Sequence, residues 1–337
     1  MKLFKFHILP LIFLFLFSCG EMKPNNSEII WKGVKQDNGW IYIALQGGLS
    51  ISKDGGSTFE NKTTAHGLGN NYIRSIYVDN DNVIYAGTTG GLSISTDGGA
   101  SFTNKTSSDG LAGTAVNRII ADSNGKIYLA TSGGLSITSN GGESFTNKGV
   151  SDGLGSNSVR DVSVNSSGHI FLATTGGVSI STNGGTSFSN KTTAQGLSDN
   201  LVLSVFGDDN GDIYAGVNDV DGGLHISTDN GSSFSRKTTS DGLKGNYVDG
   251  QIFKDSKNLL YIGTFSGVST TSNGGSSFNS FEALLGYGGQ AIFLDSNEVI
   301  YAGNLYLWIS TDSGSTFVKK TTSDGLASGG INDIFVR

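Results

Sequence analysis

Residues 95–102 read STDGGASF, and variants of this octet recur six more times along the 337-residue chain. The seven copies begin at residues 52, 95, 138, 181, 227, 271 and 310, so consecutive starts are 43, 43, 43, 46, 44 and 39 residues apart. A period of about 40 to 50 residues with strand-like content is typical of the blades of a β-propeller. The octet therefore indicates a chain built from one repeated unit.

The whole unit repeats, and residues 109–148 show it in full: DGLAGTAVNRIIADSNGKIYLATSGGLSITSNGGESFTNK. Three segments, 116–122, 126–131 and 135–138, are rich in strand-forming residues and are separated by tight-turn residues. Residues 144–148 supply a fourth short strand. Four strands in each of seven units predict an all-β, seven-bladed β-propeller of four-stranded antiparallel blades over residues 29–337.

The octet resembles the Asp-box, or BNR, repeat of sialidases, sortilin-type domains and several glycosidases. The positions that match the Asp of that motif are Asp54, Asp97, Asn140, Asn183, Asp229, Asn273 and Asp312. Asn occupies three of the seven positions, and an amide oxygen keeps the role of a turn acceptor but is a poor substitute for a charged calcium ligand. We therefore expect the octet to stabilise the fold rather than bind metal.

The rest of the unit resembles the propeller repeats of hybrid two-component sensor proteins, through the pattern DGL-x-x-N-x-V-x-x-I-x-x-D-x-x-G-x-I-Y-A-G-T-x-G-G-L. Together the two resemblances cover about residues 29–337. They imply the fold and leave the function open, because one fold hosts many functions.

The end of the chain repeats only the first strand of the unit. Residues 331–336 read INDIFV and are followed by no second, third or fourth strand. We expect this segment to form the innermost strand of the first blade, which closes the ring and removes an exposed sheet edge. The alternative is that residues 30–36 (IWKGVKQ) hold the inner position and the tail lies elsewhere.

The N-terminus predicts export. Lys2 and Lys5 precede an apolar stretch, residues 6–17, that is too short to span a bilayer and is typical of a signal peptide. Residues 16–19 (LFSC) resemble the bacterial lipobox. This resemblance implies a signal peptide over residues 1–18, a lipid on Cys19, and a tether over residues 19–28. Gly20 after the cysteine implies sorting to the outer membrane; the alternative is an ordinary secretory signal with an incidental Cys.

The composition limits the classes of partner that the protein is expected to bind. Cys19 is the single cysteine, so no disulfide can form within the chain. The formal charge of −7 becomes −9 once the leader with Lys2 and Lys5 is removed. Nucleic-acid affinity comes largely from Lys and Arg side chains that contact phosphates. We therefore do not expect such an acidic domain to bind nucleic acid. The lipid would be the only contact with the membrane.

Function in a repeat protein is expected where the copies differ. One position of the predicted inner strands is mostly polar and varies between units; we call it the mouth row, and its members are Ser75, Arg118, Asp161, Ser204, Gln251, Ala291 and Asp333. The residues just before them form a second row: Arg74, Asn117, Arg160, Leu203, Gly250, Gln290 and Asn332. We expect both rows to line the channel mouth opposite the octets. The candidate ligand-binding residues are Arg74, Arg118, Arg160, Asp161, Gln251 and Asp333.

Three of these candidates are arginines in consecutive units, which invites comparison with the arginine triad of sialidases. Strand alternation places Arg118 on the opposite side from Arg74 and Arg160. The Arg-Ile-Pro motif and an evident Tyr–Glu nucleophile pair are both missing from the sequence. The three histidines after the leader (His66, His169 and His225) lack metal-ligand spacing and are interpreted as surface substitutions.

The sequence thus predicts a lipid-anchored binding or scaffold module for a protein or a glycan, with no catalytic residues, cofactor or metal. Two alternatives stay open: an Asp-box glycoside hydrolase, which would need two facing carboxyl groups about 5–9 Å apart, and a purely architectural surface protein.

Overall fold

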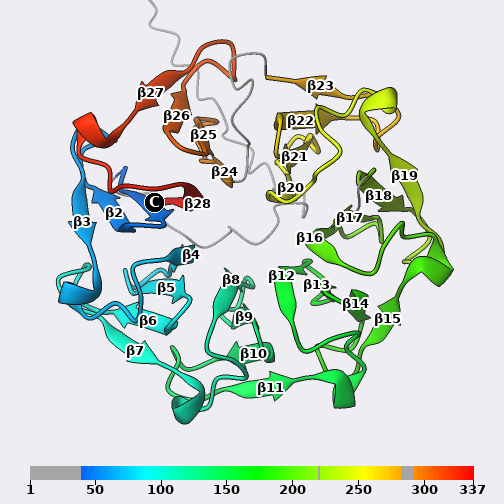
Figure 1. The fold of residues 1–337 in the computed structure, drawn as a ribbon, viewed down its shortest axis with the longest axis horizontal. Helices are drawn as coiled ribbons and strands as arrows, with labels where there is room; N and C mark the ends of the chain where they lie inside the picture. The colour runs from blue at the N-terminus through cyan, green and yellow to red at the C-terminus, as the bar shows by residue number, and fades with distance from the viewer. Residues whose placement is uncertain (1–38, 219–220, 282–290) are drawn as a thin grey trace, which may run out of the picture.

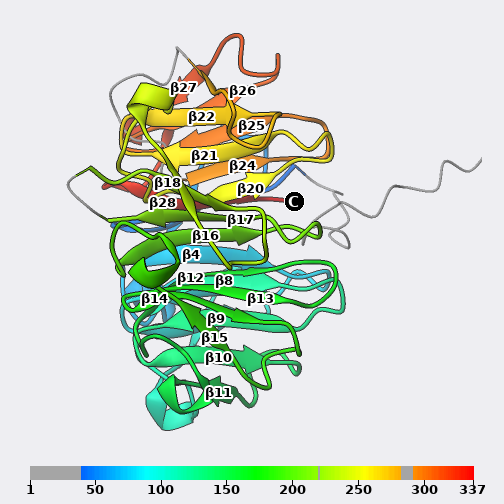
Figure 2. The ribbon, with the colours of Figure 1, turned by 90° about the vertical axis from the view of Figure 1, so that its right-hand side faces the viewer.

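The computed structural model describes residues 39–218, 221–281 and 291–337. These residues form a ring of seven four-stranded antiparallel sheets, which confirms the predicted fold (Figure 1). Figure 2 shows the ring from the side, with the strands running between its two faces. The predicted signal peptide, Cys19 and the tether lie outside the described residues.

Each blade uses its strands in chain order from the channel outward, with one exception in blade 1. Blades 1 to 4 comprise β28 (Ile331–Val336), β1 (Ile41–Leu45), β2 (Gly48–Ser52) and β3 (Glu60–Lys62); β4 (Ile73–Val78), β5 (Ile84–Thr88), β6 (Gly91–Ser95) and β7 (Thr103–Lys105); β8 (Val116–Ala121), β9 (Ile127–Thr131), β10 (Gly134–Thr138) and β11 (Thr146–Lys148); and β12 (Val159–Val164), β13 (Ile170–Thr174), β14 (Gly177–Ser181) and β15 (Ser189–Lys191). Blades 5 to 7 comprise β16 (Val202–Gly207), β17 (Ile213–Val217), β18 (Leu224–Ser227) and β19 (Ser235–Lys237); β20 (Ile252–Lys254), β21 (Leu260–Thr264), β22 (Gly267–Thr271) and β23 (Asn279–Ser280); and β24 (Ala291–Leu294), β25 (Ile300–Gly303), β26 (Leu307–Ser310) and β27 (Val318–Lys320).

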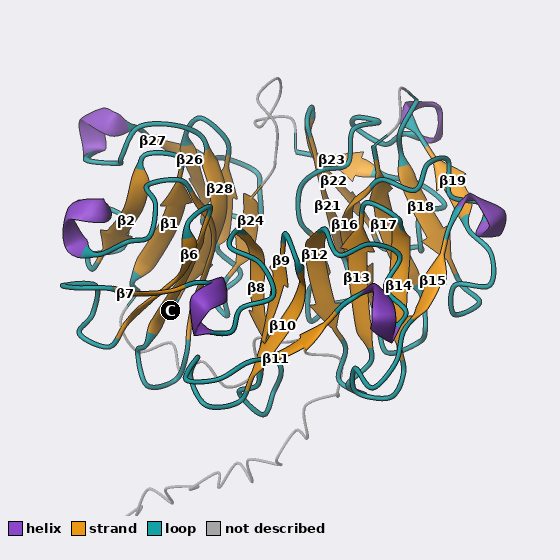
Figure 3. Cartoon of the chain, turned by 60° about the horizontal axis from the view of Figure 1, so that its bottom comes forward, coloured by secondary structure: helices purple, strands orange, loops and turns teal. Residues whose placement is uncertain are grey.

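Short 3-10 helices connect the outer strand of one blade to the inner strand of the next, and they lie at the periphery of the ring (Figure 3). A threonine caps the start of most of them, and a glycine with positive φ ends each, such as Gly110 at 100°. Those in the described residues are η1 (Thr64–His66), η2 (Ser107–Asp109), η3 (Val150–Asp152), η4 (Thr193–Gln195), η5 (Thr239–Asp241) and η7 (Thr322–Asp324).

The C-terminal strand closes the ring, as predicted. β28 is the innermost strand of blade 1 and pairs antiparallel with β1, from Ile41 opposite Val336 to Leu45 opposite Ile331. Its Phe335 is fully buried and contacts aromatic rings of three blades: Tyr42, Tyr77 and Phe293 at centroid distances of 6.4, 5.7 and 5.6 Å. The alternative segment, residues 30–36, lies outside the described residues.

Each octet folds into a turn held by its own side chains. In blade 2, Asp97 Oδ1 accepts hydrogen bonds from the Ser95 hydroxyl and the Ser101 N–H at 2.7 and 2.9 Å, and Asp97 Oδ2 accepts from the Ser101 hydroxyl at 2.6 Å. In the Asn copies the last contact reverses: Asn140 Nδ2 donates to the Ser144 hydroxyl at 2.9 Å. A hydroxyl both donates and accepts, so Asp and Asn fit the same turn.

The octets give the protein a defined sensitivity to acid. Hydrogen bonds lower the pKa of Asp54, Asp229 and Asp312 to about 2, and the largest contribution comes from the hydroxyl four residues later, such as that of Thr58 at Asp54. The Ser101 hydroxyl and N–H also hold the pKa of Asp97 well below its usual value. Since the pKa in the folded chain lies below the unfolded value of about 4, the stabilisation is present above about pH 4 and is lost as pH falls through about 2.

We therefore expect a variant with all four Asp changed to Asn to lose less thermal stability than the wild type between about pH 4 and pH 2. Melting temperatures from circular dichroism at a series of pH values measure this. A fourfold Asn variant whose melting temperature falls as steeply as that of the wild type would contradict the role given to these side chains.

Candidate functional site

The two faces of the ring carry different turns. Asp333 lies opposite Ala44 near the hairpin turn at residues 46–47, whereas Ser52, which begins an octet, pairs with Ile41 at the other end of the strand. We call the face with the turns between the second and third strands the hairpin face, and the other the octet face. The mouth row therefore lies toward the hairpin face, as expected from the sequence.

The mouth row joins neighbouring inner strands. Asp333 Oδ2 accepts hydrogen bonds from the Ser75 hydroxyl at 2.7 Å and from the Ile76 N–H at 3.0 Å, both in the next blade. Ser75 Oγ in turn accepts from the Ile119 N–H at 3.0 Å. Two further members repeat the contact: Asp161 with the Val205 N–H at 2.9 Å and Gln251 with the Ile292 N–H at 3.3 Å. Each of these side chains satisfies a backbone donor of the following blade.

Two members of the mouth row, Arg118 and Ala291, cannot accept a hydrogen bond from the next blade. In each case the next blade has an aspartate in the row, Asp161 after Arg118 and Asp333 after Ala291. Arg118 has only donors and Ala291 has no polar atom, so neither accepts from the next blade. The N–H groups that would be left unpaired, those of Val162 and Ile334, donate instead to Asp161 Oδ1 and Asp333 Oδ1 at 2.9 and 3.0 Å. An aspartate has two oxygens, so it can serve its own strand and the next blade at once.

Four candidate residues thereby meet inside the mouth. Arg118 Nη1 lies 3.0 Å from Asp333 Oδ1, Arg118 Nε lies 3.8 Å from Asp161 Oδ1, and Gln251 Nε2 donates to Asp333 Oδ1 at 2.5 Å. Burial raises the pKa of the Asp161 carboxyl although the Arg118 guanidinium opposes it. These contacts hold blades 1, 3, 4 and 6 together across the channel.

The other two candidates, Arg74 and Arg160, occupy β-bulges of their inner strands. The ladder shifts register between Ile73 and Ser75 and between Val159 and Asp161, so the simple alternation assumed from sequence is interrupted there. Arg74 donates to the side chain of Asn117 in the next blade. Arg160 is exposed and makes no hydrogen bond or ion pair with any described residue. Of the three arginines, Arg160 has the guanidinium most available to a ligand.

A third structural row was not recognised from the sequence. Ser50 Oγ donates to Asn61 Oδ1 at 2.6 Å and accepts from the Ala327 N–H at 3.0 Å, and blades 2 to 4 repeat both contacts. In blade 5 His225 replaces the serine. It is fully buried, and its Nε2 accepts from the Ser198 N–H at 3.1 Å. The interpretation of His225 as a surface substitution was therefore wrong, because its place in the repeat is an interior acceptor position.

Exposed apolar side chains gather on the hairpin face of blades 6 and 7. Tyr247 and Phe265 are 39% and 63% exposed and form an edge-to-face pair with centroids 6.3 Å apart. Leu305, 60% exposed, lies in the corresponding hairpin of blade 7. Alignment of the copies could have found this pair, because Phe265 stands where blades 2 and 3 have Thr89 and Ser132.

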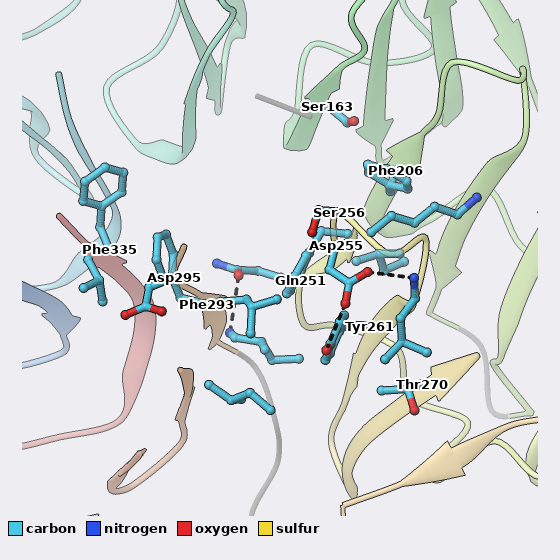
Figure 4. A pocket seen from close by; sticks show the side chains of 18 of the residues that line it. Ser163, Phe206, Gln251, Asp255, Ser256, Tyr261, Thr270, Phe293, Asp295 and Phe335 are labelled. Carbon is cyan, nitrogen blue, oxygen red and sulfur yellow. Dashed lines mark hydrogen bonds between the residues drawn. The ribbon is translucent and has the colours of Figure 1, made fainter. Parts of the chain in front are cut away.

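A cavity of about 550 Å³ lies inside the ring. It is lined by Arg118, Asp161 and Gln251 toward the hairpin face and by turn residues of blades 6 and 7, including Asp255 and Asp295, toward the octet face. Figure 4 shows Phe206, Phe293 and Phe335 among its walls. Its volume falls in the range typical of small-molecule sites.

Within the described parts of the chain, no group of three or more His, Cys, Asp or Glu side chains is arranged to hold a metal ion. In the same residues, no helix has the length and apolar character needed to cross a bilayer.

Comparison with known proteins finds a match to the family model "Two component regulator propeller" over residues 67–90. No curated protein sequence matches the chain significantly.

Several solved structures share the fold. The extracellular domain of the putative hybrid two component system BT3049 from B. thetaiotaomicron is 18% identical, with a TM-score of 0.62 over 89% of this chain and 47% of that one. An ancestral GH74 enzyme is 18% identical, with a TM-score of 0.59 over 90% and 46%. YCF48 from Cyanidioschyzon merolae is 15% identical, with a TM-score of 0.54 over 78% and 94%, and YCF48 has also been solved bound to a D1 peptide.

The chain spans about half the length of the first two structures. At these identities the likeness shows the propeller fold, which sensor domains, enzymes and peptide-binding proteins share.

Proposed function

We propose that the protein is an exported, membrane-anchored propeller that binds a protein or a glycan through its hairpin face. The anchor is the lipid on Cys19, with residues 19–28 as the tether, and the outer membrane is its site. The lipobox resemblance supports this part of the proposal. The propellers in extracellular sensor domains and in peptide-bound YCF48 support a binding role.

The observation that carries the proposal is the concentration of available side chains on one face. Arg160 offers an exposed guanidinium beside the channel mouth that pairs with none of the residues that the structure describes, and Tyr247 and Phe265 offer exposed rings on the same face. Exposed Arg and aromatic side chains are the residues that contribute most to binding interfaces. They also stack on sugars or pair with acidic groups, so both partner classes fit.

A hydrolytic role has less support. Asp161 and Asp333 both lie beside Arg118 at the mouth, and each accepts backbone N–H groups on both oxygens. Such groups hold the ring together and are poorly placed to transfer protons to a substrate. We therefore propose binding without catalysis, although the ancestral GH74 enzyme shows that this fold also occurs in enzymes.

The test is a pull-down from cell envelopes together with a glycan array, using full-length protein extracted in detergent. We expect a partner whose binding falls about tenfold or more in Arg160→Ala and in Phe265→Ala. Arg236→Ala is the control, since Arg236 is an exposed arginine on the outer strand β19. Equal binding by all three variants, or turnover of a fluorogenic glycoside lost in Asp161→Asn, would contradict the proposal. The Cys19→Ser variant tests the anchor: we expect it to be recovered from cells without detergent, because it cannot carry the lipid.

A further inference from the structure

The ring has a seam between blades 6 and 7. β20 has three residues and β23 has two, which makes blade 6 the blade with the shortest inner and outer strands among the described residues. In that part of the chain, β20 and β24 also pack less closely than any other neighbouring pair of inner strands. The cavity reaches the octet face at this seam, between the turns that carry Asp255 and Asp295.

Aromatic side chains that depart from the repeat line the seam. Phe281 stands where the other six copies have lysine, and it lies 6.3 Å from Tyr261 and 5.9 Å from Phe317 between ring centroids. Phe253 stacks on Tyr261 at 5.0 Å with an angle of 6° between the rings. Phe253 and Phe281 are only half-buried, although both line the cavity. The cavity therefore presents flat apolar surface to a ligand.

The charges at the same opening are unbalanced. Lys254 pairs with Asp208, and Lys257 pairs with Glu298, each at 2.5 Å. Asp255 and Asp295 lie at the opening, and neither forms an ion pair within the described residues. Their oxygens accept only from turn N–H groups and a tyrosine hydroxyl, such as the Leu259 N–H on Asp255 at 2.8 Å. Lys257 also attracts Asp255 electrostatically, but its ion pair is with Glu298. Among these described side chains the four carboxylates therefore outnumber the two lysines, which leaves an excess of negative charge at the opening.

We propose that this cavity binds a small hydrophobic organic cation, with its aryl or alkyl part against Phe253 and Phe281 and its ammonium group at Asp255 and Asp295. Aromatic faces and carboxylates both attract an ammonium group, and the apolar part gains by leaving water. The site lies on the octet side of the channel, so it is separate from the partner-binding surface proposed on the hairpin face.

Calorimetric titration of the full chain with a matched series tests the proposal: 4-phenylbutylamine, 4-phenylbutanol and 4-phenylbutyrate. The three share one apolar part and differ in charge. We expect the amine to bind most tightly and the butyrate at least about tenfold more weakly, because two carboxylates attract one and repel the other. Equal affinities, or no binding of the amine up to ~10 mM, would overturn the proposal.

The double variant Asp255→Asn/Asp295→Asn locates the site. Asn165 occupies the equivalent turn position in blade 4 and keeps the turn through its Oδ1, which accepts from the His169 N–H at 2.9 Å. The amide is therefore compatible with the fold. We expect the amine to bind about fivefold to tenfold more weakly to this variant, with the alcohol unchanged. The control is Asp79→Asn/Asp122→Asn in blades 2 and 3. An equal loss in the control, or no loss in either variant, would refute the assignment.

Discussion

Replacing Asp333 with alanine is expected to lower the free energy of unfolding by about 3–5 kcal/mol, because it removes one partner of a buried charge pair. Asp333 is 3% exposed and accepts hydrogen bonds from the N–H groups of Ile76 and Ile334 and from two side chains, Ser75 and Gln251. Its removal leaves these donors without their acceptor inside the channel mouth and takes from the Arg118 guanidinium the nearer of its two carboxylate partners. Each unpaired buried donor costs about 1–3 kcal/mol.

Chemical denaturation of Asp333→Ala and the wild type measures the difference. Ser204→Ala is the matched control, because Ser204 holds the same position in blade 5 and makes one interblade hydrogen bond, to the Val248 carbonyl at 3.3 Å. We expect this control to lose about 1 kcal/mol. If the two variants are equally stable, the mouth row does not couple the blades in the way described.

Most of the fold could be predicted from the sequence because the information is repeated seven times. Any one octet or strand segment is a weak signal, but seven copies in register specify the number of strands, their order and their turns. The incomplete last copy, residues 331–336, also predicted the closure, since a lone inner strand fits the inner position of the first blade, although residues 30–36 were an alternative for that position. That prediction was confirmed by the β28–β1 ladder.

The interactions at the channel mouth could be predicted only in part. The mouth row was recognised as polar and variable, but its contacts join residues of different blades, such as Asp333 with Ile76. Which side chain must be an aspartate depends on what the preceding blade supplies, as Arg118 and Ala291 show. Such dependence appears only when the blades are placed side by side. The bulges at Arg74 and Arg160 likewise change the direction of side chains that simple alternation describes.

Two aromatic residues that differ from the repeat could have been recognised in the sequence but were not predicted as site residues. Phe265 and Phe281 each replace a polar residue that most copies share. Phe265 lies in a hairpin and Phe281 at the end of an outer strand, so neither belongs to the two inner-strand rows that supplied the predicted candidates. Comparison of every position of the unit would have found both.

Removal of residues 331–337 is expected to abolish the cooperative unfolding transition. The deletion takes away Ile331, Ile334 and Phe335, whose side chains are at most 2% exposed, and leaves β1 without its inner partner. Each such side chain contributes about 2–5 kcal/mol, so their summed loss is comparable to the whole stability of a typical domain, about 5–15 kcal/mol. The exposed edge of β1 would also promote aggregation.

Thermal unfolding of the chain that ends at Gly330, followed by circular dichroism with and without a synthetic peptide of residues 331–337, tests ring closure most directly. Closure by β28 predicts no sharp transition for the shortened chain alone and recovery of one when the peptide is added. A shortened chain that melts as sharply and at the same temperature as the full chain would contradict closure by the C-terminal strand.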